Sequence, residues 1–165
     1  LTFNHFIEDY FFDSSSVEFL KYNYLLLGLI IFSSKFIKNG NNEIITFRNA
    51  FLIGLGQTFA ILPGISRSGL TIVIAIYLGV SFKSATRFSF LLAIPILFFA
   101  TLETVFSNFS NFYNNINTQI FIGFIFSFVI GYLTLELLQR IIANQKFWYF
   151  SFYCFLISFI LFYVI

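Results

Sequence analysis

The stretch LPGISRSGLTI, residues 62–72, gathers side chains that could bind an anion. It holds one arginine, two serines, one threonine and two glycines, and apolar segments flank it on both sides. A guanidinium can grip two phosphate oxygens at once, hydroxyls can donate further hydrogen bonds, and glycines let a ligand approach the backbone. A helix starting near Ser68 would add free N–H groups and the positive end of its dipole. The stretch therefore predicts a phosphate site.

Arg67 also has a plainer interpretation. The Pro-Gly-x-Ser-Arg-Ser sequence could form an interfacial turn whose arginine only meets lipid headgroups. A charge at membrane depth costs several kcal/mol unless it lines water or pairs with an anion. Because charges inside a membrane usually mark function, we favour the phosphate site.

Composition indicates an all-α integral membrane protein. Of the 165 residues, 59% are hydrophobic and 10% are charged, and the mean hydropathy is +0.89; all three lie outside the usual range of soluble domains. The aromatic residues are spread through every apolar run and the net charge is only +2, so we expect no nucleic-acid partner. The single cysteine, Cys154, lies inside an apolar run and predicts neither a disulfide nor a thiolate metal site.

Four apolar runs approach the length of about 20 residues that a helix needs to cross a bilayer. The predicted spans are roughly Tyr22–Ile37, Phe88–Phe106, Gln119–Leu138 and Phe147–Ile165. In the third span the small residues Gly123, Ser127 and Gly131 form a stripe that predicts a helix-packing face.

Residues 44–82 predict a re-entrant hairpin between the first two spans. The second half of this segment, SGLTIVIAIYLGV, is too short for a hydrocarbon core about 30 Å thick. Pro63 and Gly64 supply a break, because proline ends a helix and glycine tolerates unusual backbone angles. Backbone exposed at such a break must be buried in protein or line a watery cavity.

The basic residues lie in loops that can all be placed on the same side of the membrane. Positively charged loops are expected inside the cell, and here they flank the hairpin and separate the last two spans. These residues are Lys35, Lys38, Arg48, Lys83, Arg87, Arg140 and Lys146. The segments Thr2–Glu18 and Ser107–Thr118 contain no Lys or Arg. We therefore expect the PGISRSG turn to face the outer half of the membrane, although two full spans would satisfy the same pattern.

The motifs also carry a family resemblance. GLGQTFAILPGISRSGLTI, followed by FSFLLAIPI, resembles the second half of the undecaprenyl-diphosphate phosphatases, also called bacitracin-resistance proteins, whose signature is PGxSRSxxT. An upstream GxxQ at Gly54–Gln57 and FSFLLAIP at Phe88–Pro95 follow in the same order. The signature residues are Pro63, Gly64, Ser66, Arg67, Ser68 and Thr71.

The resemblance implies an inverted-repeat fold in which two re-entrant hairpins meet at one pocket. It also implies a polyprenyl diphosphate substrate, hydrolysis of undecaprenyl diphosphate to the monophosphate, and a site on the outer side of the bacterial inner membrane. That activity would recycle the lipid carrier for peptidoglycan synthesis, with effects on cell shape and bacitracin resistance. By position, Arg67 would clamp the diphosphate, and Ser66, Ser68 and Thr71 would donate hydrogen bonds. The substrate-binding set adds Gly64, Gly69 and Gln57, although Gln57 could equally be a helix-packing amide.

The chain departs from the family at its acidic residues. The family's (E/Q)xxxE motif, with its histidine, would supply a base and the ligands of a divalent cation, Mg or Ca. This motif is absent, and no His, Asp or Glu lies between Glu43 and Glu103. We read His5, Glu8 and Asp9 as solvated or interfacial residues. We therefore expect no metal ligands in this chain, and the attacking group, a serine or water, stays open.

Residues 1–165 are read as one membrane domain. The chain opens LTFNHFIEDY without an initiating Met, so we expect a fragment that lacks the N-terminal repeat and is inactive alone. Glu136 and Arg140, four residues apart, predict an ion pair, and Glu103 is expected near the outer interface. The oligomeric state, including a homo-oligomer, stays open.

Two other functions fit part of the pattern. A transporter or flippase also binds a lipid phosphate or another anion at a broken helix. A non-catalytic membrane scaffold would not need Arg67 for activity. Phosphate release by the full-length protein would separate these alternatives from a phosphatase.

Overall fold

The computed structural model describes residues 14–107 and 118–164, and these residues form helices joined by turns. His5, Glu8 and Asp9 lie outside the described residues. In the described part, β-structure is limited to one isolated bridge between Asn42 and Val80. The α-helices are α2 (Ser14–Ser33), α3 (Phe47–Gln57), α4 (Arg67–Tyr77), α5 (Phe82–Ser107), α7 (Thr118–Ala143) and α8 (Phe150–Val164). Three short 3₁₀ helices are η1 (Ser34–Phe36), η2 (Thr58–Ile61) and η3 (Phe147–Tyr149).

Three helical segments are long and apolar enough to cross a membrane. They are Phe82–Ser107, Thr118–Ala143 and Phe147–Val164, and each contains one of the last three predicted spans almost completely. The all-α membrane class is therefore confirmed. The first predicted span falls mainly in α2, which starts several residues earlier than expected; its crossing of the bilayer stays a prediction.

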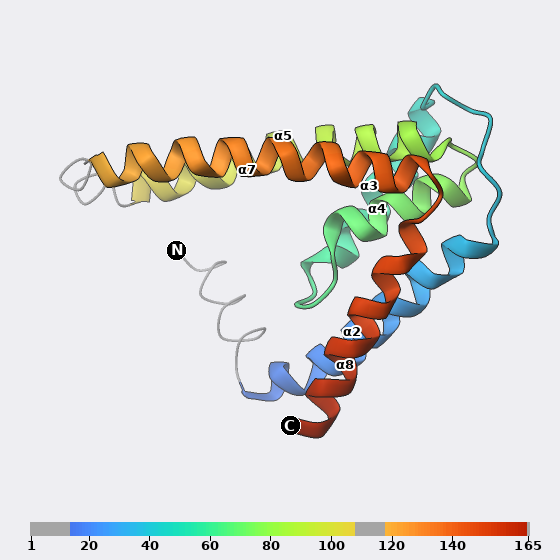
Figure 1. Ribbon diagram of the computed structural model, residues 1–165, viewed down its shortest axis with the longest axis horizontal. Coiled ribbons are helices and arrows are strands. Elements are labelled where there is room, and N and C mark those ends of the chain that lie inside the picture. Colours follow the sequence, from blue (N-terminus) through green and yellow to red (C-terminus); the bar gives the residue numbers. More distant parts are fainter. Residues whose placement is uncertain (1–13, 108–117, 165) are drawn as a thin grey trace.

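The helices form two pairs with the broken helix between them. Helices α5 and α7 run alongside one another, and α2 packs along α8 (Figure 1). The approach of α2 to α8 is close, because a Cβ added at Gly28 would lie 2.6 Å from the Cε1 atom of Phe155. The Ser158 hydroxyl also donates to the Lys21 carbonyl at 2.8 Å. These contacts hold the C-terminal helix against α2.

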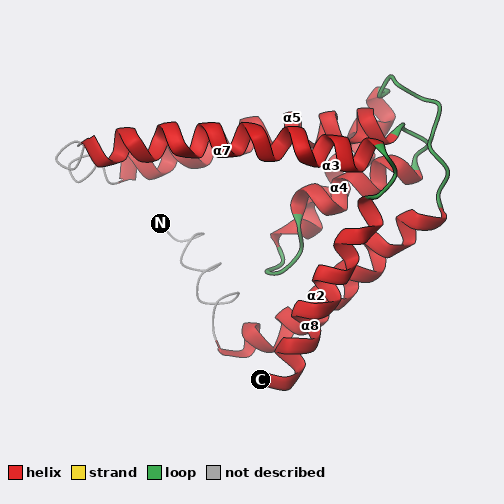
Figure 2. Cartoon of the chain, in the orientation of Figure 1, coloured by secondary structure: helices red, strands yellow, loops and turns green. Residues whose placement is uncertain are grey.

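The broken helix consists of α3, η2, a short turn and α4, and the turn lies at the end of α4 opposite the connection to α5 (Figure 2). Helices α3 and α4 have 11 residues each and pack against one another. At 1.5 Å per residue each is about 16 Å long, roughly half of the hydrocarbon core. These lengths favour the re-entrant hairpin, which stays a prediction because its depth in a bilayer is untested.

Helix α4 is the most deeply packed element near the break. Its residues from Gly69 to Val73, together with Ala75 and Ile76, are buried. It contacts α3, α5 and α2, so apolar neighbours surround it on several sides. Loop contacts also fix the segment that follows α4: the Asn42 amide donates to the Gly79 carbonyl at 3.4 Å, and the Asn39 side chain accepts from the Phe82 amide at 2.9 Å. Helix α4 is therefore fixed by its neighbours along most of its length.

Helix α7 is less covered by the described chain. A Cβ at Gly123 or Gly131 would meet nothing within 4 Å, so the predicted packing stripe has no neighbour among the described helices. The reason is that α7 packs mainly on α5 and leaves its other faces open. The predicted ion pair between Glu136 and Arg140 is confirmed, and Glu103 is exposed near the end of α5.

Candidate functional site

The helix break is built by three consecutive backbone features. Leu62 ends η2 in an extended conformation, Gly64 has a φ of 88°, and Ser66 is extended immediately before α4. Glycine is suited to the positive φ because it has no Cβ to clash with the backbone. The sequence placed the break at Pro63 and Gly64, and the structure agrees.

Ser66 caps the new helix. Its Oγ accepts a hydrogen bond from the Gly69 amide at 3.1 Å, as serine does at helix N-termini. The first α-helical backbone bond runs from Leu70 to the Ser66 carbonyl. The amides of Arg67 and Ser68 precede that bond and point out of the helix end with the positive dipole. The hydroxyls of Ser66 and Ser68 lie 3.4 Å apart beside them.

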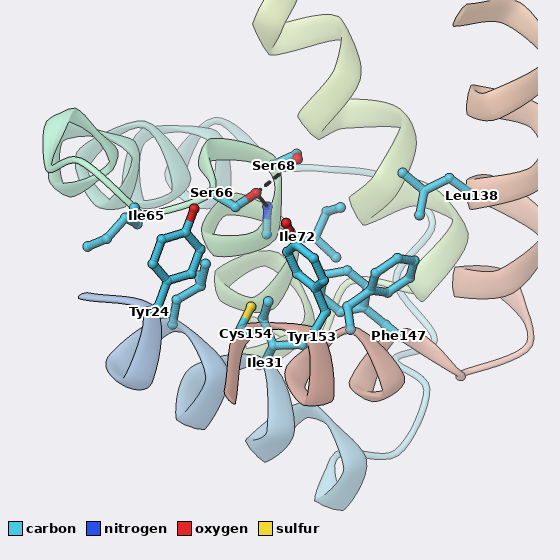
Figure 3. Close-up of a pocket in the computed structure, with 14 residues that line it drawn as sticks. Tyr24, Ile31, Ile65, Ser66, Ser68, Ile72, Leu138, Phe147, Tyr153 and Cys154 are labelled. Atoms are coloured by element: carbon cyan, nitrogen blue, oxygen red, sulfur yellow. Dashed lines mark hydrogen bonds between the residues drawn. The ribbon is translucent and has the colours of Figure 1, made fainter. Parts of the chain in front are cut away.

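A pocket of about 460 Å³ lies against this helix start (Figure 3). Its walls come from the turn, α4, α2, the end of α7, η3 and α8. The lining residues are Tyr24, Leu27, Ile31, Gly64, Ile65, Ser66, Ser68, Gly69, Ile72, Leu138, Phe147, Phe150, Tyr153 and Cys154.

The pocket has two chemically different parts. Ser66 and Ser68 lie at the start of α4, and the hydroxyl ends of Tyr24 and Tyr153 point toward them in Figure 3. Most of the remaining walls are aliphatic or aromatic. Ligand pockets of this kind place a few convergent polar groups on a largely apolar surface. The geometry suits an amphiphile with an anionic head at the helix start and an apolar tail along the walls.

The structure brings four of the predicted site residues together. Gly64, Ser66, Ser68 and Gly69 all line the pocket. A Cβ at Gly69 would lie 3.1 Å from the Cβ of Ser66, so a larger residue would crowd the cap. The serine hydroxyls, the glycines and the N-terminus of α4 therefore lie close together, as the sequence predicted.

Thr71 lies on another face of α4 and does not line the pocket. Its hydroxyl is 2.9 Å from the Arg67 carbonyl and 2.7 Å from the hydroxyl of Ser89 on α5. The side chain is buried, with 1% exposure. Thr71 is rotated by about 60° around the helix axis from Ser68, and its hydroxyl is directed to Ser89 of α5. In this structure Thr71 joins α4 to α5.

Arg67 is half-buried at the first position of α4 and is not among the pocket-lining residues. It lies one turn before Thr71, on the same side of the helix. Within the described chain its guanidinium forms no hydrogen bond or ion pair. An arginine without a carboxylate partner leaves its charge available to an anion. The predicted diphosphate clamp stays a prediction.

Gln57 ends α3 before η2 and is half-buried outside the pocket. Its Oε1 atom is buried and has no hydrogen-bond partner among the described residues. A buried amide oxygen without a partner is uncommon because its desolvation is not compensated. Neither of its two interpretations, pocket lining or helix packing, is settled by these contacts.

The sequence did not predict the pocket-lining residues that belong to helices distant from the turn in sequence. Tyr24 belongs to α2, Leu138 to α7, and Tyr153 to α8, all far from the PGISRS turn in sequence. The chain contains 28 Phe and 9 Tyr, so no aromatic residue stands out from the others by its type. Only the packing of α2 against α8 identifies these particular side chains.

The described residues hold no group of three His, Cys, Asp or Glu side chains that could bind a metal ion. The pocket itself contains hydroxyl and apolar side chains and one thiol, but no carboxylate or imidazole. This donor set does not suit Mg²⁺ or Ca²⁺, which prefer several carboxylate or carbonyl oxygens. No catalytic step is therefore assigned to a cation here.

The fold and site define a helical membrane protein with an anion-suited pocket at a broken helix. The chain belongs to the family described as bacitracin resistance protein BacA, which matches residues 1–160. Among curated proteins, it is 37% identical over 163 residues to an undecaprenyl-diphosphatase of Methanococcus maripaludis, covering 96% of this chain and 61% of the relative. It is 34% identical over 155 residues to that of Halothermothrix orenii, covering 92% and 60%.

A third relative, the undecaprenyl-diphosphatase of Methanococcus vannielii, is 39% identical over 125 residues. That match covers 73% of this chain and 46% of the relative. The chain thus spans about half the length of the curated relatives it matches. The likeness extends beyond the PGISRSGLT stretch to nearly the whole chain.

Proposed function

We propose that the full-length protein containing this chain hydrolyses undecaprenyl diphosphate to undecaprenyl phosphate and inorganic phosphate. The observation that carries the proposal is the position of Ser66 and Ser68 at the start of α4, inside a pocket with largely apolar walls. The polar end suits the diphosphate, and the walls suit the beginning of an isoprenoid tail. The substrate itself is taken from the names of the relatives.

The start of α4 supports phosphoryl transfer through electrostatics. Negative charge spreads over the phosphate oxygens during the reaction, and prearranged donors stabilise it. The amides of Arg67 and Ser68 and the serine hydroxyls are such donors at one helix end. The guanidinium of Arg67, which has no partner among the described residues, would add a full positive charge. Thr71 contributes by holding α4 against Ser89 of α5.

The proposal includes a divalent cation, Mg or Ca, as the family resemblance implies. Its ligands must come from outside the described residues, which gather no suitable set. A chelator such as EDTA should abolish phosphate release by the full-length protein, and added Mg²⁺ or Ca²⁺ should restore it. Full activity in EDTA would remove the cation from the proposal.

We further propose that the protein resides in the bacterial inner membrane with this site toward the outer side. The sidedness of the basic loops supports this orientation. Release of the monophosphate on that side would return the lipid carrier to peptidoglycan synthesis. A homo-oligomer stays a prediction.

The decisive experiment measures phosphate release from undecaprenyl diphosphate by the full-length protein in nanodiscs. Arg67→Ala should lower kcat/KM by about 100-fold or more, the usual effect of removing a preorganised charge donor. Arg67→Lys should retain part of the activity because it keeps the charge but loses the two-pronged grip. Arg87→Ala is the matched control, since Arg87 is exposed on α5 and does not line the pocket.

The outcomes separate the candidate functions. Phosphate release that depends on Arg67 supports the phosphatase. Transfer of a labelled lipid phosphate across the bilayer without phosphate release would favour the transporter or flippase. Arg67→Ala with wild-type activity would show that Arg67 is not the clamp.

A further inference from the structure

Two tyrosines from different helices face the start of α4. Tyr24 comes from α2 and Tyr153 from α8, and both line the pocket. In Figure 3 their hydroxyl ends point toward the side of the pocket that carries Ser66 and Ser68. The helices that carry the two tyrosines, α2 and α8, pack along one another (Figure 1).

Tyr24 is seated directly against the turn. Its ring atoms Cε2 and Cδ2 would lie 3.2 and 3.3 Å from a Cβ placed at Gly64. The preceding residue, Asn23, donates from its side-chain amide to the Pro63 carbonyl at 2.8 Å. Two adjacent residues of α2 therefore contact the Pro-Gly turn. This arrangement fixes the Tyr24 ring beside the residues that begin α4.

Tyr153 is held through the backbone of α8. Its neighbour Cys154 is buried, and the Ser151 hydroxyl, one turn earlier, donates to the Trp148 carbonyl at 2.7 Å. The close approach of Gly28 to Phe155 fixes the same turn of α8 against α2. The Tyr153 side chain remains 61% exposed, so a ligand in the pocket can reach it.

Both tyrosine hydroxyls are available to a ligand. In the described parts of the chain, the hydroxyls of Tyr24 and Tyr153 form no hydrogen bond. By contrast, the Tyr77 hydroxyl donates to Ser33 Oγ at 2.7 Å. Tyr24 is half-buried and Tyr153 is exposed, so both hydroxyls are free to donate to a ligand in the pocket. Among the described residues neither hydroxyl has a partner, and both face the anion-suited end of the pocket.

We propose that the hydroxyls of Tyr24 and Tyr153 donate hydrogen bonds to the phosphate oxygens of the lipid diphosphate that Ser66 and Ser68 bind. The inference rests on the proposed function for the identity of this ligand. The two rings simultaneously form part of the wall for the first isoprenoid unit. Tyr24 and Tyr153 are thus substrate-binding residues that orient the head of the lipid at the start of α4.

The bond to the phosphate is tested by removing one oxygen atom at a time. Tyr24→Phe and Tyr153→Phe keep the ring on the wall and delete the donor. The matched controls are Tyr22→Phe on α2 and Tyr163→Phe on α8, because neither residue lines the pocket. All four variants are made in the full-length protein and compared in nanodiscs by their thermal unfolding.

Binding is measured with farnesyl methylenediphosphonate, a diphosphate lipid that cannot be hydrolysed, and with farnesol, which has the same tail without phosphate. Loss of a hydrogen bond to a charged group should raise the Kd of the diphosphonate about tenfold for each pocket variant. The Kd of farnesol should change less than twofold. With undecaprenyl diphosphate, KM should rise by a similar factor, while kcat changes less than threefold.

Each result decides one question. Unchanged diphosphonate affinity in both Phe variants would overturn the proposal, and so would an equal loss of diphosphonate and farnesol binding, which would indicate a purely structural role. A wild-type protein that binds the diphosphonate but releases no phosphate would overturn the proposed function and leave the tyrosine proposal standing. A wild-type protein that does not bind the diphosphonate would overturn both.

Discussion

Gly64→Ala tests whether the helix break depends on a backbone angle that glycine allows. Gly64 has a φ of 88°, in the left-handed region where a side chain clashes with the backbone. Placing alanine there costs about 1–2 kcal/mol in backbone energy. The new methyl group would also lie 3.2 Å from Leu20 Cδ2 and from Tyr24 Cε2, so both side chains must shift.

The total loss should be about 1–3 kcal/mol in the free energy of unfolding, since the Leu20 and Tyr24 side chains can partly give way. The Tyr24 ring should move away from the turn, and the affinity for a diphosphate lipid should fall with it. Unfolding is followed by circular dichroism in detergent with increasing denaturant, and lipid affinity is measured on the same samples.

Gly54→Ala is the matched control. A Cβ at Gly54, in the middle of α3, meets nothing within 4 Å. Alanine in a helix interior is favoured over glycine by roughly 0.5–1 kcal/mol, so this variant should be as stable as the wild type or slightly more stable. If Gly64→Ala matched the wild type, or if both variants lost equal stability, the account of the break would be wrong.

Three further substitutions test contacts that position the site. Ser89→Ala removes the 2.7 Å partner of Thr71 and should cost about 1–3 kcal/mol, measured as unfolding free energy, with Ser89→Thr recovering part of the loss. Gly28→Val should separate α2 from α8, because a Cβ at Gly28 already lies 2.6 Å from the Phe155 ring; cross-linking of cysteines placed on the two helices should fall. Glu136→Gln removes an ion pair whose side chains are 73% and 46% exposed, and it should change unfolding free energy by less than about 1 kcal/mol.

Local sequence was sufficient to predict the helices that contain long apolar runs. The apolar runs that begin at Phe88, Gln119 and Phe147 predicted membrane-length helices because each is close to the length of a bilayer crossing. Their starts differ by a few residues, since polar residues such as Lys83 and Ser84 continue the helix beyond its apolar part. Pro63 and Gly64 predicted the break because their effect on the backbone is local.

The site was predicted in part for the same reason. Ser66, Ser68 and the glycines cluster at a helix start, and capping depends on residues only three positions apart. Thr71 shares their motif but not their direction, because its position on the helix turns it toward Ser89. The spacing of the signature groups these residues, and only the packing of α4 against α5 shows that the Thr71 hydroxyl contacts Ser89.

The sequence by itself determined an all-α membrane protein, the place of its helix break and the anion-suited start of the helix that follows. Tertiary structure decided which side chains complete the pocket. Tyr24 and Tyr153 reach it because α2 and α8 pack closely at Gly28, a contact between segments at opposite ends of the chain. In a sequence this rich in aromatic residues, wall residues and lipid-facing residues have the same composition, and only packing distinguishes them.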